Sequence, residues 1–213
     1  MLQFYYHPLS PLARRVWICL LEKNLQFESI IVNLDQGEQL KPDFLELNPF
    51  HHVPVLVDDD LKIIESMAIM DYLEAKYPEI ALLPNEPQTI ARVKMAQMVA
   101  SNELGSQIIP LIFYDPKSLE VSQAKRKLKR ICLFLSDLLK DDLYFGGNQF
   151  AIGDIVAGNG LILTQKLGFD LQQFPILDSY CKRLMTRKAW QTTQPNQEQI
   201  AVWQEIVKTL FKR

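Results

Sequence analysis

Hydrophobic and polar positions follow two different periods along this chain, and the change of period divides it into two parts. Up to residue 78, short apolar runs alternate with polar turns and with helical stripes. After residue 88 only helical stripes remain, in which apolar residues recur at every third or fourth position. The pattern predicts a mixed α/β domain over 1–78, a linker over 79–87 and an all-α domain over 88–213.

The first domain is predicted to have the order βαβ, short helix, ββα. Strands are expected over 2–6 and 27–32, and the apolar stripe between them predicts a helix over 11–23. A short helix over 41–48 ends before Pro49. Because a strand–helix–strand unit crosses over with a right hand, the first two strands should be parallel. This order predicts a thioredoxin-like, four-stranded mixed sheet with helices on its faces.

The stretch 48–78 carries the strongest local signals in the first domain. Two short apolar runs, 53–57 and 61–64, flank three consecutive aspartates and predict a β-hairpin. Ser66 then stands at a predicted helix N-cap, ahead of an apolar stripe. That helix should end before Pro78, because the residue before a proline is pushed out of the α region.

Pro54 is unusual inside an apolar run, since proline cannot donate to a sheet ladder. In one interpretation the Val53–Pro54 bond is cis, a form that costs an X–Pro bond only about 0.5–1 kcal/mol. A cis bond would leave the backbone N–H and C=O of Val53 free to pair with an extended ligand. In the other interpretation, the bond is trans and the proline merely starts a strand. Cis bonds are rare, so local sequence alone favours this second interpretation.

The second domain is expected to consist of helices, over 88–113, 118–140, 153–166, 176–187 and 198–211. Pro110 kinks or ends the first of them, and Gly146 and Gly147 interrupt the chain after the second. The basic run 125–130 surrounds the apolar Leu128, which indicates a solvated helix face.

Composition excludes several classes of function. Of 213 residues, 48% are hydrophobic and 23% are charged, which are ordinary globular values. A net charge of −2 gives no electrostatic reason to expect nucleic acid or an anionic membrane as a partner. The three histidines have no metal-ligand spacing, so no metal is expected.

Compartment is indicated by the cysteines and by the absence of apolar targeting segments. An odd number of widely spaced cysteines, Cys19, Cys132 and Cys181, argues for reduced thiols in a cytosol-like compartment. The N-terminal run 1–6 is too short for a signal peptide, and no apolar run reaches transmembrane length. A cytoplasmic location is therefore expected. Cys19 lies on the apolar stripe of the first helix, which favours a core position.

Five motifs, in order along nearly the whole chain, resemble those of the cytosolic glutathione transferases, most closely the phi class. The segments are SPLARRVWICLLEKNLQFE, LNPFHHVPVL, IIESMAIMDYLEAKYP, FAIGDIVAG and YCKRLMTRKAW. The resemblance implies a cis bond at Pro54, a homodimer, and reduced glutathione as co-substrate. It also implies the family's fold, a thioredoxin-like domain followed by a helical one.

The resemblance assigns the catalytic role to Ser10. Its hydroxyl would donate to the sulfur of glutathione and lower the thiol pKa, because a hydrogen bond to a charged form favours that form. The dipole of the following helix would help. A serine before Pro11 is also an ordinary N-cap, and capping statistics alone favour that simpler role. Both roles are compatible.

Glutathione binding is assigned to further positions by the same resemblance. Glu65 and Ser66 match the pair that holds the zwitterionic γ-glutamyl end, and Val53 matches the residue that pairs with the cysteinyl backbone. His52 and either Gln39 or Lys41 would lie near the glycyl carboxylate. The register there is uncertain, because Gln39-Leu40 stands where phi-like chains often have His-Lys.

The implied function is conjugation of glutathione to small hydrophobic electrophiles. A weakly catalytic ligand-binding protein with the same fold is the alternative from another class, and a glutathione-dependent peroxidase is an alternative enzyme. The Ser-Ser-Cys start of zeta-type isomerases is absent. Residues 108–114 with Leu12 form either the second-substrate pocket or ordinary core. Ala151 and Asn148 depart from the family pattern at positions that concern stability.

Overall fold

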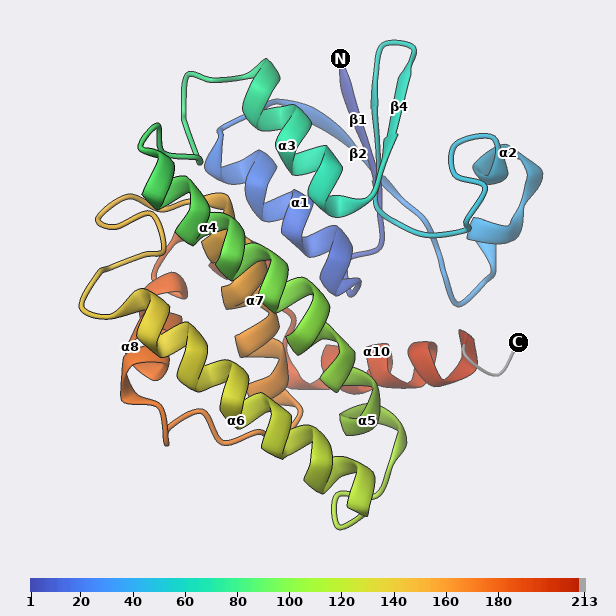
Figure 1. Ribbon diagram of the computed structural model, residues 1–213. Coiled ribbons are helices and arrows are strands. Elements are labelled where there is room, and N and C mark those ends of the chain that lie inside the picture. Colours follow the sequence, from blue (N-terminus) through green and yellow to red (C-terminus); the bar gives the residue numbers. More distant parts are fainter. Residues whose placement is uncertain (211–213) are drawn as a thin grey trace. The chain divides into compact units, whose positions relative to one another are not determined.

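The computed structural model describes residues 1–210 and forms two compact units (Figure 1). Unit 1 comprises Met1–Ala81 together with the C-terminal segment that begins at Thr193, and unit 2 comprises Leu82–Thr192. The predicted linker, 79–87, contains the boundary between residues 81 and 82. No helix within residues 1–210 is both long enough and apolar enough to cross a membrane.

Unit 1 contains a four-stranded sheet in the order β2-β1-β3-β4. The strands are β1 (Leu2–Tyr6), β2 (Phe27–Ile31), β3 (Val55–Asp58) and β4 (Leu61–Ile64). β1 and β2 are parallel, whereas β3 is antiparallel to both β1 and β4. The predicted thioredoxin-like mixed sheet is confirmed.

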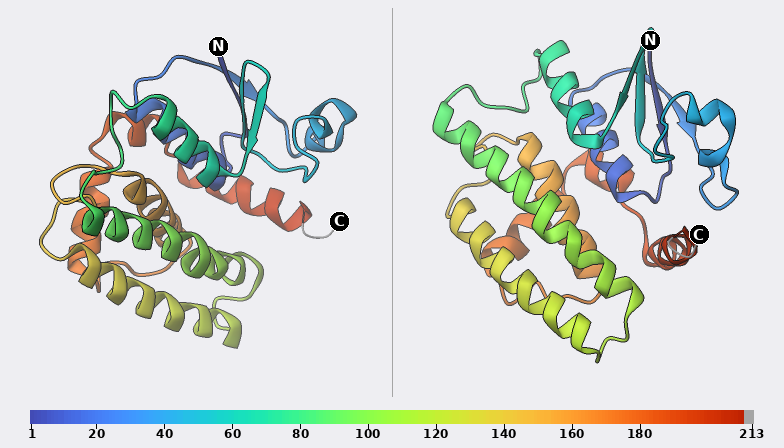
Figure 2. Two further views of the ribbon diagram at one scale, coloured as in Figure 1. Left: turned by 45° about the horizontal axis from the view of Figure 1, so that its top comes forward. Right: turned by 45° about the vertical axis from the view of Figure 1, so that its right-hand side comes forward.

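Helices lie on both sides of this sheet (Figures 1 and 2). α1 (Pro11–Glu22) and α3 (Ser66–Lys76) contact one another on one side, while η1 (Glu38–Leu40) and α2 (Pro42–Leu45) lie on the other. The core between the sheet and the first pair is apolar, and its fully buried members include Phe4, Val16, Leu20, Leu56, Ile69 and Leu73.

The start of α3 corrects the prediction by one residue. Glu65, not Ser66, occupies the N-cap, and Ser66 is the first helical residue. Glu65 has φ 66° and ψ 117°, a left-handed backbone that side chains rarely adopt. Local capping preference points to the serine, so the strained residue before it could not be inferred from the pattern.

α10 (Gln197–Leu210) belongs to unit 1 although it follows unit 2 in sequence. Its apolar residues Ile200 and Trp203 are buried, whereas Val207 and Leu210 are half-buried. Part of the apolar surface of α10 is therefore accessible. The last residue of the predicted helix over 198–211 lies outside the described residues.

Unit 2 is entirely helical apart from two isolated bridges near Gly146. The predicted helix over 88–113 is interrupted rather than continuous. α4 (Pro87–Val99) passes through a π-helical turn, η2 (Ala100–Leu104), and a 3₁₀ turn, η3 (Gly105–Gln107), into α5 (Ile108–Phe113). Pro110 lies in the first turn of α5, where its missing N–H removes no helical bond.

The remaining helices of unit 2 surround α7 (Ile152–Lys166), which is buried from residue 152 to 164. They are α6 (Leu119–Leu139), α8 (Pro175–Leu184) and the short α9 (Lys188–Thr193), which ends at the boundary with unit 1 and was not predicted. Gly153 brings α7 close to α4, because a Cβ there would lie 2.6 Å from the carbonyl oxygen of Val93.

Asp154 anchors the start of α7. Its carboxylate accepts the N–H of Ala151 at 2.8 Å, the N–H of Phe145 at 3.0 Å and the hydroxyl of Tyr180 at 2.9 Å. Ala151 has no side-chain acceptor, so the N–H of Asp154 donates instead to the Ala151 carbonyl at 2.9 Å. The alanine therefore changes how the start of α7 is capped, but the N–H of Asp154 still has a hydrogen-bond acceptor.

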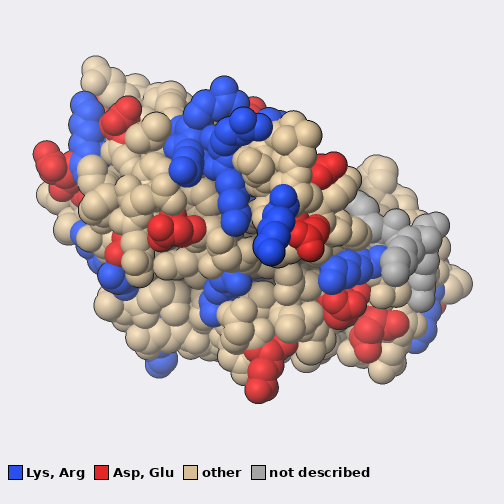
Figure 3. Space-filling view, turned by 90° about the horizontal axis from the view of Figure 1, so that it is seen from below, with Lys and Arg blue, Asp and Glu red and all other residues tan. Residues whose placement is uncertain are grey.

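The basic run 125–130 lies on α6. Leu128 is fully buried, whereas Arg126, Lys127, Lys129 and Arg130 are exposed. Figure 3 shows lysine and arginine side chains gathered on one face of the molecule. This arrangement fits the predicted solvated helix face.

Candidate active site

The register of the sheet brings four connections to one end of unit 1. Tyr5 pairs with Val55, and Val55 pairs with Ile64 on the next strand. On the other side, Tyr6 pairs with Ile31. The loops after β1, β2 and β4 and the loop before β3 therefore meet at this end. Since neighbouring strands are about 4.8 Å apart, these loops span roughly 15 Å.

Ser10 lies in the loop after β1 and caps α1. Its Oγ accepts the N–H of Ala13 at 3.2 Å, and its own N–H donates to the carbonyl oxygen of His7 at 2.9 Å. Ser10 is 9% exposed. Within residues 1–210 its hydroxyl hydrogen has no acceptor, so the group can still donate one hydrogen bond.

No base is hydrogen-bonded to Ser10 among the described residues. The nearby His7 ring uses Nδ1 to accept the N–H of Leu9 at 3.3 Å. Burial lowers the pKa of His7, with a smaller opposing effect from the negative charge of Asp35. A neutral imidazole that is directed at the backbone does not activate a serine. The geometry thus allows Ser10 to donate at a helix N-terminus, and no described residue is arranged as a base that would activate it as a nucleophile.

Glu65 and Ser66 lie after β4 at the same end of the sheet. Ser66 is buried at the first position of α3, where the first N–H groups of the helix lack helical partners. The Glu65 side chain is exposed and makes no capping hydrogen bond. A strained backbone held in place by its surroundings is often found at ligand sites. Together the two residues offer a carboxylate beside an anion-binding helix start.

Val53 lies in the loop before β3, and its bond to Pro54 is cis, as predicted. Val53 itself precedes the first ladder residue, Val55. Its N–H and C=O make no backbone hydrogen bond to any residue within 1–210. This pair of backbone groups is therefore able to hydrogen-bond an extended ligand.

Asn48 holds the same loop and was missed by the sequence analysis. It is 3% exposed, its side-chain amide donates to the carbonyl oxygen of His52 at 2.8 Å, and its Oδ1 accepts the N–H of Phe50 at 3.0 Å. An asparagine before a proline is a recognisable turn signal, so this role could have been found. His52 is exposed, and Asn48 fixes its backbone.

Gln39 and Lys41 differ sharply in surroundings. Gln39 is 3% exposed, and its Oε1 has no hydrogen-bond partner in the described part of the chain. Its carbonyl oxygen lies 3.4 Å from Nδ1 of His51, which connects it to the loop before β3. Lys41 is exposed and lies 3.5 Å from the Glu38 carboxylate. The atom of Gln39 that lacks a partner is an acceptor, so this observation by itself does not indicate an anionic ligand.

Burial raises the pKa of two other side chains of unit 1. The Tyr6 side chain is hydrogen-bonded to Ser29, while burial, the larger effect, raises its pKa. Cys19 is fully buried and burial raises the pKa of its thiol to about 12, which makes it inert. All three cysteines are buried and free of disulfides. No cluster of three or more potential metal ligands occurs within residues 1–210.

Comparisons with known proteins agree on one family. The family profile "Glutathione S-transferase, N-terminal domain" matches residues 4–84. The chain is 36% identical to "Glutathione S-transferase 1" of Dianthus caryophyllus, over 91% of this chain and 93% of that protein. It is 32% identical to "Glutathione S-transferase zeta class" of Euphorbia esula, over 83% and 82%. Glutathione transferase E6 of Drosophila melanogaster superposes with a TM-score of 0.80 at 28% identity, over 98% and 97%.

Proposed function

This chain belongs to the glutathione S-transferase family and is a glutathione transferase, and we propose that Ser10 is the residue through which it activates glutathione. The observation that carries the proposal is the Ser10 hydroxyl. It caps α1, retains its hydrogen, and lies at the end of the sheet where Val53, Glu65 and Ser66 also lie. A donor at a helix N-terminus stabilises a thiolate and so lowers its pKa.

We further propose that glutathione lies across this end of the sheet. Its γ-glutamyl carboxylate binds Ser66 and the first N–H groups of α3, and its ammonium faces Glu65. The cysteinyl backbone pairs with Val53. The glycyl carboxylate is assigned to the Nε2–H groups of the buried Gln39 side chain, because an amide nitrogen can donate to an anion. Lys41 and His52 supply weaker, exposed contacts.

The proposed reaction needs no group beyond these. The thiolate sulfur forms a bond to the electrophilic carbon. The displaced electron pair then leaves with a leaving group or, in an addition, takes a proton from solvent. Ser10 keeps its own proton throughout and donates a hydrogen bond to the sulfur. The second substrates are small hydrophobic electrophiles, as the resemblance implies.

Phi-class membership, a homodimer and a cytoplasmic location are part of the same proposal. Exposed apolar side chains on α4 and α6 are available to a self-association surface. They include Met95, Met98, Leu133 and Phe134. Two-fold dimers are also the commonest oligomers. Light scattering at micromolar concentration should give twice the mass of the 24.7 kDa chain.

Turnover of a chlorinated dinitrobenzene with glutathione tests the function, and Ser10→Ala tests the residue. The variant should retain glutathione binding but lose turnover by roughly 10–100-fold, which corresponds to one hydrogen bond to an anion. Tight glutathione binding without turnover of a panel of electrophiles would favour the ligand-binding alternative. Equal turnover by wild type and Ser10→Ala would remove Ser10 from the mechanism.

A further inference from the structure

A four-residue turn connects β1 to α1, and one residue accepts both of its backbone hydrogen bonds. The turn 7–10 begins at His7 and ends at Ser10, with Pro8 and Leu9 at its centre. The N–H of Ser10 donates to the carbonyl oxygen of His7 at 2.9 Å, and the N–H of Leu9 donates to Nδ1 of the His7 ring at 3.3 Å. Proline has no N–H, so His7 accepts from both backbone donors that follow it in the turn.

The position of the Ser10 hydroxyl depends on this turn. On the helix side, Ser10 is bound through its Oγ to the N–H of Ala13 at 3.2 Å and through its carbonyl oxygen to the N–H of Arg14 at 2.9 Å. Its own backbone is extended, with φ −72° and ψ 117°, so the helix does not set the path of the chain before it. The turn 7–10 sets that path. A displacement of about 1 Å in a reacting group can cost two orders of magnitude in rate.

The hydrogen bond from Leu9 to the ring of His7 exists in only one protonation state of the ring. Nδ1 accepts when the imidazole is neutral and carries its hydrogen on Nε2. In the imidazolium both nitrogens are donors, so two N–H groups would face one another and the turn would have to open. Asparagine makes the same bond to the N–H two residues ahead with an amide oxygen that does not titrate in this range.

Two opposing effects act on the charge of the His7 ring. The residue is half-buried, and burial, the larger effect, lowers its pKa. The negative charge of Asp35 raises it. Asp35 belongs to the loop after β2, which lies beside the turn because the N–H of Val32 donates to the carbonyl oxygen of Tyr6 at 2.8 Å. The ring is therefore neutral at neutral pH and gains its proton in acid.

Other charged residues of the neighbouring elements are directed elsewhere. Glu38, on the same side as Asp35, accepts the N–H of Asn33 at 2.8 Å and its Nδ2 at 3.0 Å, and it lies 3.5 Å from Nζ of Lys41. Arg14, the first charged residue of α1, donates from Nε to Thr193. Among residues 1–210, Asp35 is the charged residue that shifts the pKa of His7.

We propose that His7 is a positioning residue for the reaction: its neutral ring holds the turn 7–10 so that the Ser10 hydroxyl faces the thiolate, and protonation of the ring releases the turn. This inference rests on the proposed function. His7 takes no proton from Ser10 or from glutathione, and it acts only through the backbone of Leu9 and Ser10. In acid, thiolate stabilisation is then lost through the turn as well as through protonation of the thiol itself.

Two substitutions of His7 separate its acceptor from its shape. His7→Leu has no acceptor for the N–H of Leu9, whereas His7→Asn restores one. With glutathione and a chlorinated dinitrobenzene near neutral pH, kcat should fall about 3–10-fold in His7→Leu, the effect of one ordinary hydrogen bond. KM for glutathione should stay near the wild-type value, and His7→Asn should recover most of kcat. Equal losses in the two variants, or no loss in either, would overturn the inference.

The pH profile tests the protonation step. The ratio of kcat/KM in wild type to kcat/KM in His7→Asn cancels the titration of the glutathione thiol, which both proteins share. This ratio should be constant near neutral pH and should fall as pH drops below the ordinary histidine pKa of about 6.5, because only wild type then loses its acceptor. A ratio that stays constant throughout the acid range contradicts the assignment.

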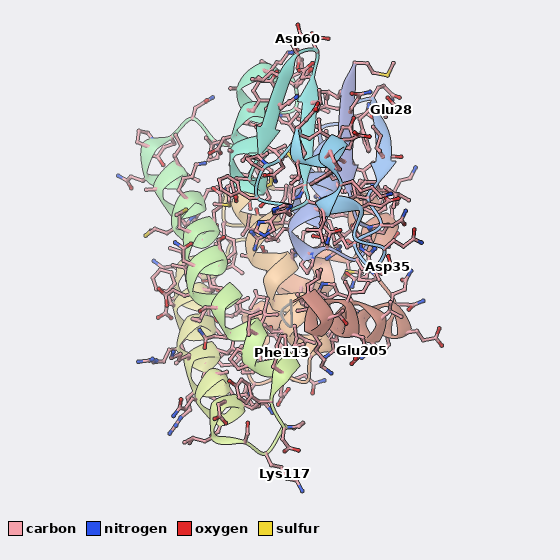
Figure 4. All side chains as sticks on the ribbon, turned by 90° about the vertical axis from the view of Figure 1, so that its right-hand side faces the viewer. Glu28, Asp35, Asp60, Phe113, Lys117 and Glu205 are labelled. Atoms are coloured by element: carbon pink, nitrogen blue, oxygen red, sulfur yellow. The ribbon has the colours of Figure 1, made fainter. Side chains whose placement is uncertain are left out.

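Asp35 provides a matched pair of charge variants. Asp35→Asn removes the charge that raises the pKa of His7, so the fall of the ratio should move to lower pH when both proteins carry this substitution. Asp60→Asn removes the same charge from the exposed hairpin turn at the opposite end of the sheet and should leave the fall in place. Figure 4 shows Asp60 at one end of unit 1 and Asp35 toward the other. Equal responses of the two variants would overturn the inference.

Nuclear magnetic resonance of the full chain separates this inference from the function on which it rests. Without glutathione, the amide resonances of Leu9 and Ser10 should titrate with the His7 ring in wild type and should not titrate in His7→Asn. If these amides titrate but Ser10→Ala turns over as fast as wild type, the proposed role of Ser10 fails and the switch in the turn stands. If Ser10→Ala loses turnover but the amides do not follow pH, the role of Ser10 stands and the assignment of His7 fails.

Discussion

Arg14 and Thr193 are 179 residues apart in sequence, yet the guanidinium Nε of one donates to the carbonyl oxygen and to the hydroxyl of the other at 3.1 and 3.2 Å. Both residues are buried. Burial lowers the pKa of Arg14 to about 10, which still leaves it charged at neutral pH. A charged group that is buried must keep its hydrogen bonds, so this contact ties α1 to Thr193, the last residue of α9, ahead of α10.

Arg14→Met should therefore lower the free energy of unfolding by about 2–4 kcal/mol, because it removes the hydrogen bonds that the buried guanidinium donates to Thr193. Urea unfolding measures the loss. Arg126→Met, at an exposed position on α6, is the control and should change stability by less than about 0.5 kcal/mol. Equal stability losses in the two variants would contradict the prediction.

Glu65 combines a strained backbone with a proposed binding role. Glycine and alanine at this position should therefore differ in stability but lose the same glutathione affinity. Glycine adopts positive φ without penalty, whereas alanine does not. Glu65→Gly should be more stable than Glu65→Ala by about 1 kcal/mol. Both variants should lose glutathione affinity by about 1–3 kcal/mol with the carboxylate. Urea unfolding and calorimetry check the two halves, and equal stabilities of the two variants would refute the strain.

Asp58 should make stability depend on pH in the acid range. Its Oδ2 accepts from Lys76, from the Tyr72 hydroxyl at 2.7 Å and from the Tyr77 hydroxyl at 3.4 Å. The hydrogen bond from Lys76, more than any other effect, lowers the pKa of Asp58, with burial opposing it. A carboxyl whose pKa is lowered by folding stabilises the fold above its unfolded value of about 3.9, and that contribution is lost as pH falls through the folded value.

The measurement is urea unfolding of wild type and Asp58→Asn between pH 3 and pH 7. Wild type should be the more stable by a constant amount above about pH 5, and the difference should shrink below about pH 4. Asp60→Asn, in the exposed turn of the same hairpin, is the control. A difference that is independent of pH would show that Asp58 acts through shape and not through charge.

Much of unit 1 follows from local pattern because its strands are short and bounded by turns. The hairpin over 53–64 and the capped helix after Ser10 need only alternation, three aspartates and a Ser-Pro pair. The cis bond at Pro54 is different, since local statistics favoured trans and only the family resemblance favoured cis. The strain at Glu65 could be predicted neither from local statistics nor from the family resemblance, because tertiary packing imposes it.

Contacts between distant segments were not predictable from a single sequence. The sequence around Arg14 does not indicate that its partner is Thr193. The placement of α10 is also not local, since it follows unit 2 in sequence but belongs to unit 1. The helix α9 was missed because six residues provide too little of a stripe. The expected second-substrate pocket at 108–114 with Leu12 stays a prediction.

Ser10 has two roles that a single alanine variant cannot separate, because the hydroxyl both caps α1 and is proposed to hold the thiolate. Ser10→Asp keeps an N-cap acceptor for Ala13 but cannot donate and repels an anion. Ser10→Thr keeps both the acceptor and the donor. Stability should therefore fall by about 1 kcal/mol in Ser10→Ala and much less in the other two.

The pKa of bound glutathione should order the same variants differently. Thiolate absorbance against pH should give the lowest thiol pKa in wild type and Ser10→Thr, a higher one in Ser10→Ala, and the highest in Ser10→Asp, where a carboxylate faces the sulfur. The loss of one hydrogen bond to an anion, about 1.5–3 kcal/mol, corresponds to roughly one to two pKa units. Coincident titrations of wild type and Ser10→Ala would reduce Ser10 to a cap and leave the thiolate to the N–H groups of the α1 N-terminus.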